Sequence, residues 1–94
     1  MIRSFSCKET ERIWNGSSSK KIPAKIQNVA RRKLRMINNS INIQDLKIPP
    51  ANRLEKLKGN LKGYYSIRVN EKYRIIFQWN SPNATKVKLI DYHE

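Results

Sequence analysis

The sequence is poor in residues that build cross-links and metal sites. Its 94 residues contain one cysteine, Cys7, and one histidine, His93. A disulfide within the chain is therefore impossible, which fits a reducing compartment, and a structural zinc site lacks its ligands. No carboxylate cluster in the sequence suits a hard metal ion. We expect no metal and no other cofactor.

Long apolar runs are also missing. No stretch approaches the ~18 apolar residues that a membrane-spanning helix needs. The first residues, MIRSFSCKETERIW, lack the apolar core of a signal peptide. We therefore expect a cytoplasmic protein.

Acidic residues are scarce against basic ones. Seven Asp and Glu stand against 20 Lys and Arg, which gives a net charge of +13. Lysine and arginine neutralise phosphates and release counterions, so nucleic acid is the first candidate partner. An anionic membrane surface is the second.

The chain length predicts one domain, residues 1–94, with a modest core. Residues 2–6 alternate weakly and could form an edge strand. Good helix formers over 7–14 predict a first helix, and 15–19 predict a break.

A second helix should follow Pro23 and end at 38–40. Its apolar stripe would contain Ile22, Ile26, Val29, Ala30, Leu34, Ile37 and Ile41. Its other face would contain Lys25, Arg31, Arg32 and Arg35, either as a solvated surface or as an anion-binding one.

Residues 42–63 show no regular pattern, and Pro49-Pro50 excludes helix locally. A loop this long in a small domain is usually functional or disordered. Its cations are Arg53, Lys56, Lys58 and Lys62, and leucines 54, 57 and 61 could hold it against the core.

Three strands are predicted at 64–69, 73–79 and 85–92, joined by tight turns. Their odd-numbered residues are apolar and should pack on the helices, so that Tyr65, Tyr73, Phe77 and Trp79 belong to the core. Their even-numbered face should present Arg68, Arg74, Lys88 and Tyr92 to solvent. Tyr64 and Tyr92 on that face are candidates for stacking on bases. The fold class is therefore α+β, with two N-terminal helices packed on a small antiparallel β-sheet.

The same region holds the groups that RNA cleavage without a metal requires. A base must take the 2′-hydroxyl proton, cations must stabilise the charge on the phosphorane, and an acid must protonate the leaving 5′-oxygen. The available set is Glu55, Lys58, Arg68, Arg74, Asp91, Tyr92 and His93. Composition alone does not separate this set from that of any basic protein.

Order and spacing are more specific than composition. The sequence resembles the HigB branch of the RelE toxin superfamily over essentially its whole length. The matching residues are Arg53-Leu54, Leu57-Lys58-Gly59, Gly63-Tyr64, Ser66-Ile67-Arg68-Val69, Tyr73-Arg74-Ile75, Phe77 and Asp91-Tyr92-His93.

The resemblance implies a RelE-like fold and a toxin of a type II toxin–antitoxin pair. Such toxins are mRNA interferases that cut messages in the ribosomal A site, without a metal, by attack of the 2′-hydroxyl on its own phosphate. The implied partners are the 70S ribosome with its mRNA and a cognate helix-turn-helix antitoxin of the HigA kind. Operator DNA would be contacted only through the antitoxin, and no membrane is involved.

Carried over by position, the family's catalytic residues match Lys58, Arg74, Asp91, Tyr92 and His93. Glu55 stands where some HigB proteins have histidine, and with Arg74 and His93 it resembles the Glu–Arg–His set of other superfamily members. Our hypothesis is that Glu55 is the general base, His93 the general acid, and Lys58 with Arg74 the phosphate clamp. The opposite assignment of base and acid stays open, as does a simple salt bridge from Glu55 to Arg53 or Lys56.

Strict strand alternation would point Asp91 and His93 away from the face of Tyr92, so the terminal residues would have to twist for His93 to reach a phosphate. The remaining cations expected to contact RNA are Arg53, Lys56, Lys62, Arg68, Lys88, Arg31, Arg32 and Arg35. Two rival interpretations are a non-catalytic basic module that binds RNA or ribosomes, and an inactive toxin kept within a repressor complex.

Overall fold

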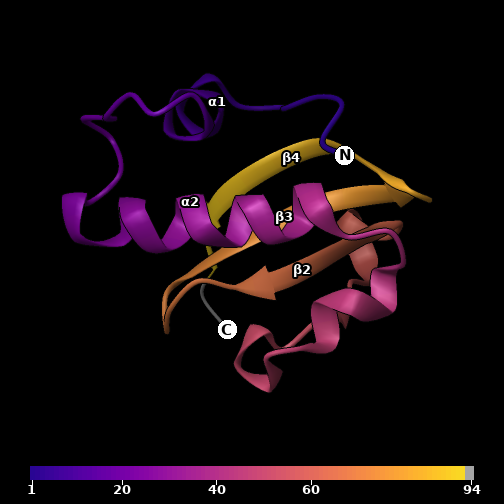
Figure 1. The fold of residues 1–94 in the computed structure, drawn as a ribbon. Coiled ribbons are helices and arrows are strands. Elements are labelled where there is room, and N and C mark those ends of the chain that lie inside the picture. Colours follow the sequence, from indigo (N-terminus) through magenta and orange to yellow (C-terminus); the bar gives the residue numbers. More distant parts are fainter. Residues whose placement is uncertain (93–94) are drawn as a thin grey trace.

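The structure, a computed structural model, describes residues 1–92, in which two helices lie on one side of a four-stranded antiparallel sheet (Figure 1). The helices are α1 (Lys8–Trp14) and α2 (Ala24–Asn39). The strands are β1 (Glu55–Lys56), β2 (Tyr64–Arg68), β3 (Tyr73–Asn80) and β4 (Asn83–Asp91), and their order in the sheet is β1-β2-β3-β4. The α+β class and the helix-on-sheet arrangement are confirmed.

The second helix begins and ends close to the predicted residues. Pro23 precedes its first residue and Ser40 follows its last. It buries Gln27 and the apolar residues Ile26, Ala30, Leu34 and Ile37, and these apolar residues lie three or four positions apart on one face. The inclusion of Ile41 in this stripe was wrong, because Ile41 lies beyond the end of the helix and is 68% exposed.

The odd-numbered sheet face forms the core with the helices, as predicted. Ile67, Ile75, Phe77, Val87 and Leu89 are buried there. The Phe77 ring lies between those of Tyr65 and Trp79, at centroid distances of 6.2 and 6.3 Å. These aromatic residues therefore stabilise the core and are not free to stack on bases.

The strand β4 changes its alternation at a bulge. Ile76 lies opposite Lys88, but Gln78 lies opposite Thr85, so β4 carries one extra residue between these pairs. Lys86 adopts a φ of +52° within that stretch. Because the bulge shifts the parity, Ala84 is buried before it although Val87 and Leu89 are buried after it. The strand β4 begins at Asn83, earlier than predicted, because the sequence pattern assigns Asn83 to the turn.

The N-terminal segment pairs with the outer edge of β4. It forms two isolated parallel bridges, from Ile2 to Ala84 and from Phe5 to Val87. The Arg3 amide donates to the Ala84 carbonyl at 2.8 Å, and the Ser6 amide donates to that of Val87 at 3.1 Å. The expected edge strand is thus reduced to two bridges, which cover the exposed edge of the sheet.

The segment predicted to be irregular contains short regular elements. Three single-turn 3-10 helices span Ile43–Lys47, Pro50–Asn52 and Gly59–Leu61, and β1 lies between the last two. The exclusion of helix at Pro49-Pro50 was wrong for a 3-10 turn, because proline is tolerated at a first helical position, where its missing N–H is not needed. Of the three leucines expected to hold this segment against the core, Leu54 packs against the core cluster, and Leu57 is buried but lies outside that cluster.

Asn52 fixes this segment to α2. It is fully buried, donates from Nδ2 to the Leu46 carbonyl at 3.2 Å, and accepts a hydrogen bond from Lys33 Nζ on α2. Burial, with the nearby charge of Arg32, lowers the pKa of Lys33. The next residue, Arg53, ends the 3-10 turn with a φ of +45°. The contacts of buried Asn52 thus fix the position of the next residue, Arg53, at the start of the candidate site.

Candidate functional site

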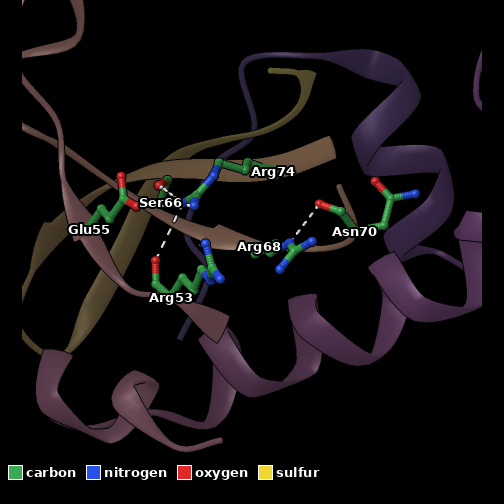
Figure 2. A network of polar contacts seen from close by, with 6 residues as sticks. All are labelled: Arg53, Glu55, Ser66, Arg68, Asn70 and Arg74. Carbon is green, nitrogen blue, oxygen red and sulfur yellow. Dashed lines mark hydrogen bonds and ion pairs between the residues drawn. The ribbon is translucent and has the colours of Figure 1, made fainter. Parts of the chain in front are cut away.

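The candidate site is built around the guanidinium of Arg74 on β3 (Figure 2). Its Nη1 donates to Ser66 Oγ at 2.7 Å and to the Arg53 carbonyl at 3.4 Å, and its Nη2 donates to Glu55 Oε1 at 3.2 Å. The Glu55 contact is also an ion pair. Arg74 is therefore held by oxygens from β1, from β2 and from the turn before β1.

The sheet register explains this convergence. Glu55 lies opposite Ser66 across β1 and β2, and Arg68 lies opposite Arg74 across β2 and β3. Ser66 and Arg68 are two residues apart and therefore share a face of the sheet, and residues directly opposite each other also share a face. Glu55, Ser66 and Arg74 therefore all lie on the sheet face that points away from the helices. The long Arg74 side chain extends from β3 over Ser66 on β2 toward Glu55 on β1 (Figure 2).

The prediction that Arg74 faces solvent was wrong. Arg74 is only 5% exposed, and Ser66 and Ile76 on the same face are buried too. The face is covered where Arg74 folds over Ser66 toward β1. Glu55 does pair with a cation, but its partner is Arg74 and neither Arg53 nor Lys56.

The Tyr92 ring lies against the guanidinium of Arg74. The Arg74 Cζ lies 5.4 Å from the centroid of the Tyr92 ring, within the range of a cation–π contact. The Tyr92 amide donates to the Lys72 carbonyl at 2.6 Å, which places the ring at the end of β4. The expectation that Tyr92 shares the face of Arg74 is confirmed. Asp91 is ion-paired with Lys72 at 3.6 Å.

Arg74 opens onto a hollow of about 420 Å³ beside the β2–β3 turn, here called the arginine hollow. Its lining residues are Arg53, Arg68, Asn70, Glu71, Lys72, Arg74 and Tyr92. Arg68 is itself fixed, because its Nε donates to the Asn70 carbonyl at 3.1 Å. Three guanidiniums in one concave site favour a bidentate oxyanion such as phosphate.

The predicted loop lysines lie in a different place. Lys56, Lys58 and Lys62, with Leu57 and Gly59, line a second hollow of about 260 Å³, here called the lysine hollow. Lys58 does not line the arginine hollow. All three lysines are exposed. The structure therefore brings Glu55, Arg74 and Tyr92 together, with Arg53 and Arg68, and sets Lys58 in a neighbouring hollow.

The predicted cations on α2 and β4 lie outside both hollows. Arg31 has a structural contact, since its Nε donates to the Ile13 carbonyl at the end of α1 at 2.8 Å. Arg32 and Arg35 are exposed on α2, which packs on the opposite sheet face from Arg74. Lys88 is exposed on β4.

His93 lies outside the described residues. Within residues 1–92 no group of three His, Cys, Asp or Glu side chains is placed to hold a metal ion. In the same part of the chain, no helix has the length and apolarity that crossing a bilayer demands.

Two groups at the site were missed by the sequence reasoning. Ser66 was treated as an ordinary strand residue, although a polar side chain in a strand between apolar neighbours is a signal that a buried partner exists. The Arg53 carbonyl has no sequence signal, because its direction follows from a left-handed conformation in a residue other than glycine.

Comparisons with known proteins identify the family of the chain. The family described as a RelE-like toxin of the type II toxin–antitoxin system HigB matches residues 3–93. Toxin HigB-1 of Vibrio cholerae is 55% identical over 58 residues, which are 62% of this chain and 61% of that protein. Endoribonuclease HigB of Proteus vulgaris is 30% identical over 93 residues, which are 99% of this chain and 100% of that protein. The HigB resemblance predicted from the sequence is confirmed.

Solved structures share the fold. YoeB in the YoeB–YefM complex from Staphylococcus aureus matches with a TM-score of 0.63 and 23% identity, over 100% of this chain and 97% of that one. YafQ from E. coli matches with a TM-score of 0.63 and 17% identity, over 97% and 91% of the two chains. At these identities the likeness concerns the arrangement of helices and strands.

Proposed function

The chain belongs to the HigB-like toxins, RelE-like toxins of type II toxin–antitoxin systems, and on this premise we propose that it is a ribosome-dependent mRNA endoribonuclease. It would cleave messages in the ribosomal A site and so inhibit translation. The relative from Proteus vulgaris bears the name Endoribonuclease HigB, and the match extends over nearly all of both chains, which supports the nuclease activity.

The observation that carries this proposal is the state of Arg74. A buried guanidinium, bonded to Ser66 and Glu55 and opening onto a hollow with two more arginines, is organised for an anion. A protein that only attracted RNA would need exposed positive charge, without a fixed orientation. Fixed donors aimed at a phosphate are what stabilise the charge that develops during phosphoryl transfer.

The proposed reaction uses the chain's own acid–base groups. Glu55 takes the proton of the 2′-hydroxyl, and the 2′-oxygen attacks the adjacent phosphorus. The bond to the 5′-oxygen breaks, and His93 gives that oxygen a proton. The products are a 2′,3′-cyclic phosphate and a 5′-hydroxyl. Arg74 binds the phosphate oxygens, whereas Lys58, in the neighbouring lysine hollow, contributes to binding of the RNA. The exchanged roles of Glu55 and His93 remain the alternative.

The proposed partners follow from the family and the charge. A cognate helix-turn-helix antitoxin of the HigA kind would neutralise the toxin and carry it to operator DNA. The solved YoeB structure is a complex with YefM, which supports an antitoxin partner in this fold. A net charge of +13 supports binding to the ribosome and mRNA in the cytoplasm.

The test is to map mRNA 5′ ends in a translating extract that receives the native protein, Arg74→Ala or Glu55→Gln. We expect new ends inside ribosome-covered codons, bearing 5′-hydroxyls, with the native protein only. Circular dichroism of each variant controls for folding. Arrested translation with intact messages would instead identify a basic ribosome-binding module, and no arrest at all would identify an inactive toxin.

A further inference from the structure

We propose that Ser66 is a positioning residue that fixes the Arg74 guanidinium for phosphate binding. The inference rests on the proposed function of Arg74 and adds a residue with no acid–base role. Ser66 lies in the middle of β2, directly opposite Ile76 on β3 and Glu55 on β1.

Ser66 makes the best-defined contact of Arg74. Its Oγ accepts from Nη1 at 2.7 Å, whereas the Glu55 and Arg53 oxygens lie at 3.2 and 3.4 Å. Ser66 is fully buried, but the Glu55 side chain is 46% exposed. Hydrogen bonds weaken as they lengthen, and exposed ion pairs exchange readily with water and salt. Ser66 is thus the partner least open to exchange.

The sequence position also points to a specific role. A hydroxyl buried in a sheet without a partner costs free energy, and serine has no packing advantage over valine or alanine there. Within residues 1–92, Arg74 is the side chain that donates a hydrogen bond to the Ser66 hydroxyl oxygen. The hydrogen bond to Arg74 is therefore the interaction that offsets the cost of burying the Ser66 hydroxyl in this strand.

The geometry divides the guanidinium into two parts. Nη1 is occupied by Ser66 and the Arg53 carbonyl, and Nη2 meets Glu55 at the exposed side. A phosphate that enters the arginine hollow can take the place of the Glu55 carboxylate at Nη2, while Ser66 keeps Nη1. Without Ser66, Nη1 would keep only the longer bond to the Arg53 carbonyl, so the guanidinium would be held less tightly and its alignment with the phosphate would be poorer.

The experiment measures single-turnover cleavage of messages on programmed ribosomes at rising toxin concentration. Ser66→Ala should lower the maximal rate about tenfold, the scale of one charge-assisted hydrogen bond, and leave the half-saturating concentration nearly unchanged. Ser66→Cys keeps the volume with a weaker acceptor and should show a similar loss. Ser40→Ala is the matched control, because Ser40, directly after α2, is also buried and its Oγ donates to the Met36 carbonyl at 2.7 Å.

A double-mutant cycle shows whether Ser66 acts through Arg74. Adding Ser66→Ala to Arg74→Lys, whose reduced rate is still measurable, should cause no further loss of rate. An equal loss in both backgrounds would overturn the proposal, as would full activity of Ser66→Cys, which would indicate a packing role.

A readout without RNA separates this proposal from the proposed function. In the free protein, the Arg74 guanidinium NMR signals, assigned by their loss in Arg74→Lys, should show restricted rotation. We expect faster rotation in Ser66→Ala and no change in Ser40→Ala. Unchanged Arg74 signals in Ser66→Ala would overturn the positioning role even if the protein is a nuclease. Normal cleavage by Arg74→Ala would refute the catalytic assignment instead.

Discussion

The arginine hollow and the lysine hollow carry the same sign of charge but differ in how that charge is held. In the arginine hollow, Arg74 and Arg68 are bonded to oxygens of the protein, at distances from 2.7 to 3.4 Å. In the lysine hollow, no hydrogen bond or ion pair within residues 1–92 restrains the side chains of Lys56, Lys58 or Lys62. One site has fixed cations, and the other has exposed cations on flexible stems.

This difference indicates a division of labour. A planar guanidinium held at both nitrogens can match the geometry of a phosphate, and less entropy is lost when it binds. An exposed ammonium contributes attraction over a distance, which depends on salt and tolerates small changes of position. We therefore expect the arginine hollow to determine the rate of reaction and the lysine hollow to determine affinity.

Exchanging the two kinds of cation should give the largest effect. Arg74→Lys keeps the charge but loses the bonds to Ser66 and Glu55, so cleavage should fall about 100-fold, as for the loss of a fixed oxyanion donor. Lys58→Arg, the reverse exchange in the lysine hollow, should remain within about twofold of the native rate because its site has no fixed geometry. Cleavage rates on programmed ribosomes measure both. If Arg74→Lys and Lys58→Arg lowered the cleavage rate equally, the two hollows would not differ in how they act.

A smaller effect is expected from removing charge in the lysine hollow. Lys58→Ala and Lys62→Ala should each weaken binding to ribosomes several-fold, and each should reduce the slope of log K against log[salt] by about 1. Sedimentation with ribosomes at several salt concentrations provides the measurement. Should Lys58→Ala abolish cleavage at saturating toxin while Lys62→Ala does not, Lys58 would belong to the chemical step.

The smallest effect is expected at Asp45, which lies outside both hollows. Its charge should affect the stability of the fold and not cleavage, so it serves as a control for the charges in the two hollows. Backbone N–H donors of Asn42 and Ile41 lower the pKa of Asp45. The stability from this carboxylate is present above its ordinary pKa of 3.8 and is lost as the pH falls through the lowered pKa.

Asp45→Asn should therefore lower the free energy of unfolding slightly at pH 7, and the difference from the native protein should shrink below pH 3.8. Urea unfolding at pH 7, 4 and 3 tests this, with cleavage expected to be unchanged at pH 7. A difference independent of pH would show that the hydrogen bonds and not the charge matter.

Most of the sheet could be predicted because apolar residues alternate along it. Ile67, Ile75 and Phe77 repeat every second position, and each is buried. Two features left no such pattern. The strand β1 has two residues, too few for an alternation to be seen. The bulge at Lys86 reverses the parity within β4, so that a single pattern cannot describe the whole strand.

The site could be predicted only in part for a different reason. Alternation gives the face from which Arg74 leaves the strand, and that face was correct. It does not give the path of a side chain long enough to cross β2 and become buried against Ser66 and Glu55. Burial of a long charged residue depends on which partners the register brings within reach, and the register follows from turns and from β1.

The bridges between the N-terminal segment and β4 have a consequence for the order of folding. The Lys86 amide donates to Ser4 Oγ across a separation of 82 residues, so Ser4 can form this contact only after the 82 residues up to Lys86 have been synthesised. Contacts this distant in sequence slow folding, because the loop between them must close first. Tyr92 follows the same late strand. A partly synthesised chain therefore has neither a closed sheet edge nor a covered Arg74, and the complete site exists only once the complete fold does.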